Sequence, residues 1–371
     1  MRAFRQRTLP RIATKPQQSA LTGGPGGSTR EAKSRTLKRM KWMRVLTLAA
    51  VVCAGLGLSA RASATTEIKI ATLAPKNSAW GKFFVKLDKK IRQKTGGEVG
   101  LRVYYNGVQG DEGAMVSKLK TGQIDAAALT SVGLSRIYKN VMVLQLPGVL
   151  DSWKLLDKAR KQMRKELEGG FEKEGFTVVG WGDLGRVRLM SKGFAVRKPS
   201  DMQGKKPVAW RDEPMAPVIY GLIGQVTPTP LGPTEVLPNL RSGAVNVISA
   251  PPLAAEQLQW TPQLDHIGAD STVCAIGGTV IRTKTLEKLP EDTRKLVLKL
   301  QRKYGKRGAK KIRKLDDAAY ARLARKMTVV KLTQAERSEW EKLLRKAVTK
   351  LGQGTFPKEL VDKVVKISGK K

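Results

Sequence analysis

The chain has 371 residues, 41% of them hydrophobic, which is enough for two domains with cores of their own and excludes disorder of the whole chain. Its formal net charge is +39; residues 65–371 keep 57 basic against 30 acidic side chains, a net charge of +27. A single histidine, His266, excludes metal sites built from several histidines and disfavours a hydrolase with a Ser-His-Asp triad. The two cysteines, Cys53 and Cys274, exclude a small scaffold held by disulfides.

Residues 1–64 have the pattern of an export signal after a disordered arm. A cationic stretch, 38–44, precedes an apolar run, 45–58, and Ala62-Ser63-Ala64 predicts cleavage after the last of these residues. A membrane anchor is the alternative, and it is disfavoured because a spanning helix needs about 20 apolar residues. The residues before Cys53 make a poor lipoprotein signal. We therefore expect a protein that is exported to the periplasm.

The first part of the exported chain predicts the order strand, helix, strand, helix, strand. Residues 67–72 and 99–104 read as strands, and the first is followed by Ser78, a residue type that caps helices. Apolar residues then recur at helical spacing between 80 and 91, so one face of this helix should be buried. This order predicts a parallel or mixed sheet with helices on its faces.

Two stretches 121 residues apart repeat one pattern. In 119–128 and in 240–249, a basic and a hydroxyl residue end a helix, a glycine (Gly122 or Gly243) caps it, and a strand of small residues follows. The first strand runs into Thr130-Ser131, and the second into Ala250-Pro251-Pro252. Because ligands bind at strand ends in open α/β sheets, the repeat predicts two similar lobes with a site between them.

The rest of the chain predicts further alternation and then a helical end. Helices are expected over 151–173, 213–222 and 234–241, and strands over 177–181, 186–190, 207–210, 225–229 and 272–282. One or two long helices are expected between 291 and 326, another over 333–350 and a short one from Pro357. Helices of this length can bridge two lobes.

Several motifs in order carry a resemblance to one family. They are 74–80 (Ala-Pro-Lys-Asn-Ser-Ala-Trp), 118–125 (Lys-Leu-Lys-Thr-Gly-Gln-Ile-Asp), 144–150 (Leu-Gln-Leu-Pro-Gly-Val-Leu), 199–206 (Pro-Ser-Asp-Met-Gln-Gly-Lys-Lys) and 228–230 (Pro-Thr-Pro). In this order and spacing, from about residue 67 to the C-terminus, the chain resembles the solute-binding proteins of TRAP (tripartite ATP-independent periplasmic) transporters, the DctP-like family. The resemblance implies a non-enzymatic protein that captures a small organic acid.

The resemblance also implies the architecture and the partners. It implies a two-lobed α/β periplasmic-binding-protein fold, similar to type II, with hinge strands and long C-terminal helices that span both lobes. We expect the first lobe to comprise 65–185 and 273–312, and the second 186–272 and 313–371. The ligand would pass to an integral membrane permease with a small and a large subunit. We expect no cofactor, no metal and no nucleic acid, and a monomer.

The candidate site departs from the family pattern. Where many members carry an arginine that grips the ligand carboxylate, this chain has Val208, so Arg211 or Arg186 is a candidate replacement, although Asp212 could simply neutralise Arg211. Ala250 stands where many members carry an asparagine. The pocket therefore looks less polar than those of the dicarboxylate binders, which favours a monocarboxylate or a bulkier apolar acid. The expected ligand-binding residues are Asn77, Gln109, Thr130, Ser131, Arg186, Trp210, Arg211, Asp212, Ala250 and Pro251.

Specific features of the sequence bear on three other functions. A module that feeds a signalling receptor would share the same fold and pocket. A secreted hydrolase is disfavoured because the sequence lacks a Gly-x-Ser-x-Gly elbow and a metal motif. A secreted nucleic-acid binder is suggested by the basic residues between 302 and 314, but a solvated helical face explains them better in an exported protein.

Overall fold

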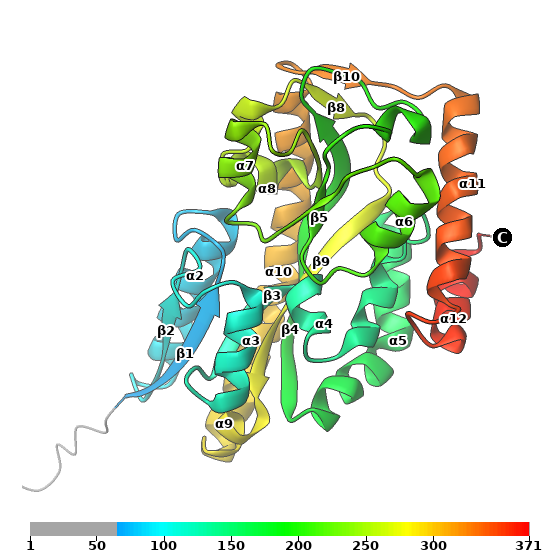
Figure 1. Ribbon diagram of the computed structural model, residues 1–371. Helices are drawn as coiled ribbons and strands as arrows, with labels where there is room; N and C mark the ends of the chain where they lie inside the picture. Colours follow the sequence, from blue (N-terminus) through cyan, green and yellow to red (C-terminus); the bar gives the residue numbers. More distant parts are fainter. Residues whose placement is uncertain (1–64, 371) are drawn as a thin grey trace, which may run out of the picture. The chain divides into compact units, whose positions relative to one another are not determined.

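The computed structural model describes residues 65–370, which lie within one compact unit, 64–371. The predicted export signal and Cys53 lie outside the described residues. Among the residues described, no helix is both long and apolar enough to cross a membrane. Figure 1 shows the arrangement of the elements.

The first lobe is built on the predicted β-α-β-α-β order. Strands β1 (Thr66–Thr72), β2 (Val99–Tyr104) and β3 (Ala126–Thr130) are parallel, and β1 lies between the other two. The helices of this part of the chain are α2 (Ala79–Lys94), α3 (Glu112–Thr121), α4 (Ser131–Ser135), the 3-10 helix η1 (Lys139–Gln145) and α5 (Trp153–Lys173). Helix α2 begins where predicted, because the Ser78 hydroxyl accepts a hydrogen bond from the Gly81 N–H.

Two long strands continue from the first lobe into the second. β4 (Phe176–Ser191) and β9 (Val273–Arg282) pair with each other in antiparallel fashion, and β9 also pairs with β3. The other end of β4 pairs with β7 (Val247–Ala250) and β8 (His266–Gly268). The result is one mixed eight-stranded sheet with the order β10-β8-β4-β9-β3-β1-β2 and β7 beside β4. The lobes are therefore connected by continuous strands, as the resemblance implies.

The second lobe adds a small parallel pair of strands and short helices. Strands β5 (Val208–Trp210) and β6 (Thr229–Leu231) form the pair, accompanied by the 3-10 helix η2 (Pro199–Met202) and by α6 (Met215–Ile223). Helices α7 (Val236–Ser242) and α8 (Pro252–Gln257) flank β7, and the 3-10 helix η3 (Thr261–Gln263) precedes β8. A core of its own, which includes Val236, Leu240, Ile248 and Ile267, fills this lobe.

After β9, the described chain is helical except for one edge strand. After α9 (Thr283–Glu287), the helix α10 (Glu291–Leu323) continues for 33 residues, so the predicted region holds one long helix rather than two. Strand β10 (Thr328–Val330) then pairs with β8 at the edge of the sheet. Helix α11 (Gln334–Leu351) packs against α6 of the second lobe, whereas α12 (Lys358–Ser368) packs against α5 of the first. The two last helices therefore lie along both lobes.

One expectation about the strands is confirmed and another was wrong. The segments 177–181 and 186–190 belong to one strand, β4, which stays continuous past Gly185 through irregularities in its pairing with β9. The strand expected over 225–229 occupies Thr229–Leu231 instead. Gln225 has a φ of 52°, a left-handed conformation that a strand does not accommodate.

The repeated helix-glycine-strand pattern is confirmed at both places. Gly122 caps α3 with a φ of 82°, and Gly243 caps α7 with a φ of 74°, so both take the left-handed conformation that favours glycine. β3 and β7 follow these caps, and both pair with one of the two long strands, β9 and β4 respectively. The pattern thus delivers one strand end from each lobe to the region where the lobes meet.

Candidate functional site

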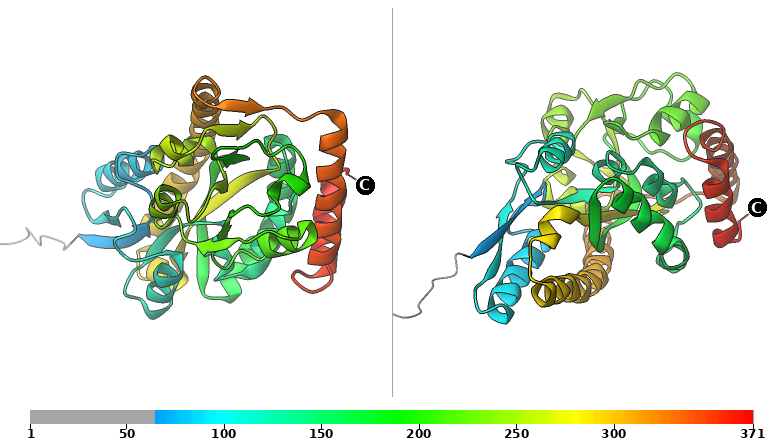
Figure 2. Two further views of the ribbon diagram at one scale, coloured as in Figure 1. Left: turned by 45° about the horizontal axis from the view of Figure 1, so that its top comes forward. Right: turned by 90° about the horizontal axis from the view of Figure 1, so that it is seen from below.

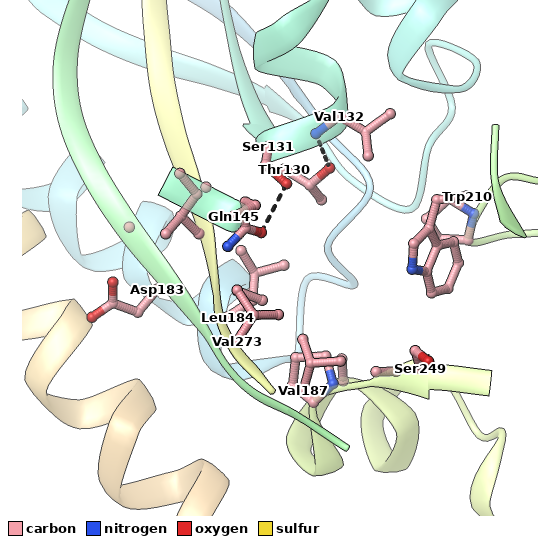
Figure 3. A pocket seen from close by; sticks show the side chains of 18 of the residues that line it. Thr130, Ser131, Val132, Gln145, Asp183, Leu184, Val187, Trp210, Ser249 and Val273 are labelled. Atoms are coloured by element: carbon pink, nitrogen blue, oxygen red, sulfur yellow. Dashed lines mark hydrogen bonds between the residues drawn. The ribbon is translucent and has the colours of Figure 1, made fainter. Parts of the chain in front are cut away.

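A cavity of about 820 Å³ lies where the two capped strands end, a volume in the usual range for small-molecule sites. The first lobe contributes Thr130 and Ser131, which follow β3 directly, and the second contributes Ser249, Ala250 and Pro251 from the end of β7. Figure 3 shows the labelled residues of both lobes around this space. The two similar units of the sequence therefore supply opposite walls of one cavity.

The polar wall comes from the first lobe, and its side chains are oriented by one another. The Ser131 hydroxyl donates to Gln145 Oε1 at 3.1 Å, and Gln145 Nε2 donates to the Cys274 carbonyl oxygen at 2.7 Å. Thr130 Oγ1 accepts from the Val132 N–H at 3.2 Å and donates to Glu112 Oε2 at 2.7 Å. Because the hydroxyl protons of Thr130 and Ser131 are both engaged, these groups face the cavity mainly as acceptors.

Glu112 is a buried carboxyl that sequence reasoning missed. It is 7% exposed, lines the cavity and receives hydrogen bonds from the backbone N–H and the hydroxyl of Thr130. Burial raises the pKa of the Glu112 carboxyl, and the hydrogen bonds from Thr130 oppose this effect only in part. Its position in the first turn of α3 reads as an ordinary helix-dipole contact, so the sequence carries no signal of its burial.

The opposite wall combines apolar side chains with the charged residues 211–213, and it includes the predicted aromatic residue. Trp210, at the end of β5, is stacked on Trp260 with 5.9 Å between ring centroids and 30° between planes. The other apolar lining residues between the lobes include Leu184, Val187, Leu189, Val208, Met215, Val273 and Ile276. Val208 lines the cavity at the position where the family resemblance implies an arginine.

Arg211 lines the cavity with its charge already balanced. Its Nη2 lies 2.6 and 2.8 Å from the two carboxylate oxygens of Glu235, and its Nη1 lies 3.3 Å from Asp111 Oδ2. The Arg211 guanidinium lowers the pKa of Glu235. Asp212 does not neutralise Arg211 as considered above, because it forms an ion pair with Arg136 of the first lobe. The backbone of Asp212 has a φ of 66°, so the chain turns between the side chains of Arg211 and Asp212.

Arg186, the second candidate for gripping a carboxylate, does not line the cavity. Its Nη2 donates to Asp317 Oδ1 of α10 at 2.8 Å. Arg188 is 5% exposed and lies over the ring of Tyr320, also of α10, at 3.7 Å. Side chains alternate between the faces of a strand, so Val187 faces the cavity while its two neighbours face the helix.

Asn77 and Gln109 also lie outside the cavity lining. Asn77 is exposed in the turn before Ser78, and Gln109 accepts a hydrogen bond from Lys118 Nζ at 2.9 Å. Of the ten expected ligand-binding residues, the structure brings seven together around the cavity: Thr130, Ser131, Trp210, Arg211, Asp212, Ala250 and Pro251. Contact of these residues with a ligand stays a prediction.

A buried ionic network holds the strand that passes between the lobes. The Asp183 carboxylate on β4 is fully buried and accepts from Arg160 of α5 at 2.6 Å and from Arg313 of α10 at 2.7 Å. Arg313 also pairs with Asp157 at 2.6 Å. Asp183 also belongs to the residues that line the cavity (Figure 3). The network therefore fixes β4 to two helices next to the site.

A second buried carboxylate, Asp316, accepts a hydrogen bond from the part of β4 that follows Asp183. Asp316 of α10 accepts from the Arg186 N–H at 2.8 Å and from the Leu253 N–H of α8 at 3.0 Å. Burial raises the pKa of Asp316 to about 6. Together with Asp183 it anchors both lobes to α10. Within 65–370, no group of three or more His, Cys, Asp or Glu side chains is placed to hold a metal ion.

A family model described as DctP, bacterial extracellular solute-binding protein, family 7, matches residues 70–354. Among curated proteins, a solute-binding protein of Chromohalobacter salexigens is 24% identical over 219 residues, which make up 57% of this chain and 63% of that protein. An uncharacterised protein of Haemophilus influenzae is 23% identical over 194 residues, 51% of this chain and 58% of that protein. The chain thus spans about three fifths of the length of these curated relatives.

Solved structures of similar fold include three that hold organic acids. A TRAP periplasmic solute-binding protein from Ralstonia eutropha H16, with bound (S)-2-acetolactate, is 22% identical with a TM-score of 0.75 and covers 82% of this chain and 99% of its own. One from Sulfurospirillum deleyianum, with succinate, is 18% identical with a TM-score of 0.75 and coverages of 81% and 98%. An extracytoplasmic solute receptor from Bordetella pertussis, with pyroglutamic acid, is 16% identical with a TM-score of 0.75 and coverages of 82% and 100%. At these identities the likeness shows the two-lobed fold.

Proposed function

Because the chain belongs to the DctP family of bacterial extracellular solute-binding proteins, family 7, we propose that it captures a small organic acid between its lobes and delivers it to a TRAP-type membrane permease. Members of this family bind solutes for transport and are not enzymes. The acids held by three proteins of the same fold, acetolactate, succinate and pyroglutamate, support a carboxylate ligand. The permease, with a small and a large integral subunit, is the partner that the TRAP assignment implies.

The observation that carries this proposal is the pairing of Thr130-Ser131 with Ser249-Ala250-Pro251 around one cavity. A ligand that touches both strand ends is in contact with both lobes only when the lobes are close together. Binding therefore shifts the protein toward the closed arrangement, by an amount set by the difference in affinity between the open and closed states. The continuous strands β4 and β9 would act as the hinge.

The lining points to an acid with one carboxylate and an apolar body. Four arginines line the cavity: Arg136, Arg211, Arg307 and Arg337. The first two and Arg337 each form an ion pair with an acidic side chain, and Arg211, at the end of β5 beside Trp210, is the one closest in sequence to the position at which the family resemblance implies an arginine. The longest of the contacts made by Arg211 is the 3.3 Å separation from Asp111. We expect the ligand carboxylate to replace Asp111 at Arg211 and the ligand body to pack on Trp210, Val187 and Val208. A guanidinium that exchanges one carboxylate for another loses little charge compensation.

The lobe boundaries form part of this proposal. The first lobe would comprise 65–185 and 273–312, and the second 186–272 and 313–371, so that each chain crossing falls on a long strand or on α10. Residues of α12, including Val361 and Val364, share the hydrophobic core of the first lobe with α5. The helical end thus contributes to both lobes. We further propose that the protein acts as a monomer in the periplasm, exported by the sequence before residue 65.

Thermal-shift screening against a panel of organic acids tests the function. We expect at least one monocarboxylate with an apolar body to raise the melting temperature of wild-type protein, and titration calorimetry to give its Kd. Arg211→Ala should weaken this acid by about tenfold or more, which corresponds to about 1.4 kcal/mol. Arg186→Ala, a change of the same chemistry outside the cavity, should leave the Kd within about twofold, well below 1.4 kcal/mol.

The possible outcomes separate the two parts of the proposal. If no acid in the panel stabilises the protein, the carboxylate function is refuted. If acids bind but Arg186→Ala weakens them more than Arg211→Ala, the function stands and the assignment of the anchoring arginine is wrong. Detection of the bound ligand in protein purified from its native periplasm, by mass spectrometry, would identify the acid directly.

A further inference from the structure

The exposed face of α10 carries a dense, uncompensated positive charge. Eight basic side chains, all exposed, lie within 16 residues of this helix: Lys299, Arg302, Lys303, Lys306, Arg307, Lys310, Lys311 and Lys314. The helix contains no acidic residue between Asp292 and Asp316. At 1.5 Å per residue, the run extends for about 22 Å along the helix. We name these eight residues the α10 basic face; two of them, Arg307 and Lys311, also line the cavity.

The neighbouring helix extends this charge. Helix α2 packs against α10, and both views of Figure 2 show the two helices next to each other. Lys82, Lys86 and Lys89 of α2 are exposed as well, and the first two also line the cavity. The contact is close because Gly308 lies against the ring of Phe83, where an added Cβ would stand only 3.3 Å from Cδ2. The basic surface is therefore wider than a single helix.

Nearby carboxylates are already engaged with arginines outside the α10 basic face. Asp88 of α2 pairs with Arg92 at 3.0 Å. On α10 itself, Asp317 pairs with Arg186 at 2.8 Å. Asp157 of α5 pairs with Arg313, which belongs to α10 but is only 22% exposed and points to the buried network. These acids consequently do little to neutralise the basic face, and its field extends into solvent.

Helix α11 shows that such a face is not a general consequence of the basic composition. It also carries exposed lysines at helical spacing, Lys342, Lys346 and Lys350, but three glutamates, Glu336, Glu339 and Glu341, are distributed along the same helix. Its charge is mixed, as expected of an ordinary solvated surface. The concentration of one sign on α10 and α2 therefore distinguishes one side of the molecule.

We propose that the α10 basic face is a docking surface for an anionic lipid bilayer. Each Lys or Arg held near an anionic membrane surface adds to the attraction, so a few of these eight residues suffice for reversible attachment. The field falls off within about 8 Å at physiological salt, so the helix must lie on the membrane rather than above it. The large apolar side chains exposed among 65–370, Val85 and Val108, are isolated, so attachment is electrostatic and without insertion.

A nucleic acid fits this surface less well. Binding of single strands adds stacking of bases on exposed aromatic rings. The aromatic side chains of α10 and α2 pack instead against the hydrophobic clusters of the protein: Phe83, Phe84 and Tyr304 in the first lobe, and Trp80 and Tyr320 against two other clusters. A membrane partner also agrees with a solute-binding protein whose ligand has to reach a membrane. Attachment to a membrane through α10 is independent of whether the solute in the cavity is an acid.

Co-sedimentation with vesicles tests the proposal. The probe is a vesicle of phosphatidylglycerol and phosphatidylcholine, with pure phosphatidylcholine as the uncharged comparison. We expect wild-type protein to bind the anionic vesicles only, and to lose at least tenfold in affinity between about 50 and 200 mM salt, as for other multivalent contacts with anionic surfaces.

A pair of matched variants isolates the helix. The triple variant Arg302→Glu/Lys306→Glu/Lys310→Glu reverses three charges of the α10 basic face at a spacing of four residues, and none of the three lines the cavity. Lys342→Glu/Lys346→Glu/Lys350→Glu makes the same net change with the same spacing on α11. The α10 variant should lose at least tenfold in vesicle affinity, and the α11 variant less than threefold.

Three results would overturn the proposal. Equal losses in the two variants would show that only net charge matters and that α10 has no special part. Binding to a DNA duplex without binding to vesicles would identify a different polyanion as the partner. Unchanged vesicle binding by the α10 variant, with its circular dichroism spectrum and ligand Kd as in wild type, would place any membrane contact elsewhere.

Discussion

Replacing Asp183 by Asn should be among the most damaging isosteric changes in this protein. The Asp183 carboxylate has no exposed side-chain surface and takes hydrogen bonds from Arg160 at 2.6 Å and from Arg313 at 2.7 Å. Asn keeps the size of the side chain, so no cavity is created. It removes the charge that compensates two arginines, and breaking one partner of a buried pair costs about 3–5 kcal/mol.

Asp157→Asn is the matched control, because Asp157 contacts the same arginine from the surface. Its side chain is 53% exposed, and its loss leaves Arg313 paired with Asp183. The expected cost is below about 1 kcal/mol, since exposed pairs contribute little. The Arg313 guanidinium lowers the pKa of Asp157, but solvent screening limits the effect on stability at this exposed position.

Urea unfolding of wild type and the two variants, followed by circular dichroism, gives the free energy of unfolding of each protein by linear extrapolation. The difference from wild type is the cost of each substitution. The m-values should be equal, because neither change alters the surface that is buried on folding. A loss for Asp183→Asn within 1 kcal/mol of the loss for Asp157→Asn would refute the reasoning, since it would mean that Arg160 and Arg313 find other compensation. We also expect Asp183→Asn to weaken ligand binding, because Asp183 fixes the strand that passes between the lobes.

Three further changes test other parts of the structure. Trp210→Ala removes an aromatic side chain from the cavity wall and should weaken ligand binding by about tenfold, or about 1.4 kcal/mol, in a calorimetric titration. Trp153 lies outside the cavity, so Trp153→Ala should leave the Kd unchanged in the same titration. Gly185→Ala should lower the free energy of unfolding by about 3 kcal/mol or more, because an added Cβ would stand 2.3 Å from Asp316 Oδ1. At Gly243 the space is open and only the positive φ is strained, so Gly243→Ala should lower the free energy of unfolding by about 1 kcal/mol in the same urea titration. Burial raises the pKa of Asp316 to about 6, so folding favours its protonated form: the associated stability is fully present below about pH 4 and is lost as pH rises through 6. A plot of the free energy of unfolding against pH should therefore be flatter for Asp316→Asn than for wild type. Identical slopes would show that Asp316 is not the source of this pH dependence.

Local patterns of the sequence were sufficient for the elements that depend on neighbouring residues. Ser78 caps α2, and Gly122 and Gly243 end their helices in the left-handed conformation, because capping and positive φ are decided within one turn of chain. The repeat around these glycines also pointed to the two strand ends that line the cavity. The ordered motifs identified the family, and the family match confirms it.

The tertiary structure decided which side chains reach the cavity and which are neutralised. Arg186 and Arg211 look equivalent in the sequence, but strand alternation and the position of α10 turn Arg186 to Asp317, while Glu235 and Asp111 gather around Arg211. Burial of Glu112 depends on Thr130, which is 18 residues away, so no local pattern could reveal it. The sequence by itself determined the helices, the caps and the two strand ends, because these follow from local propensity. Only packing between distant segments decided the charge balance of the site, because a side chain's partners depend on which elements the fold brings next to it.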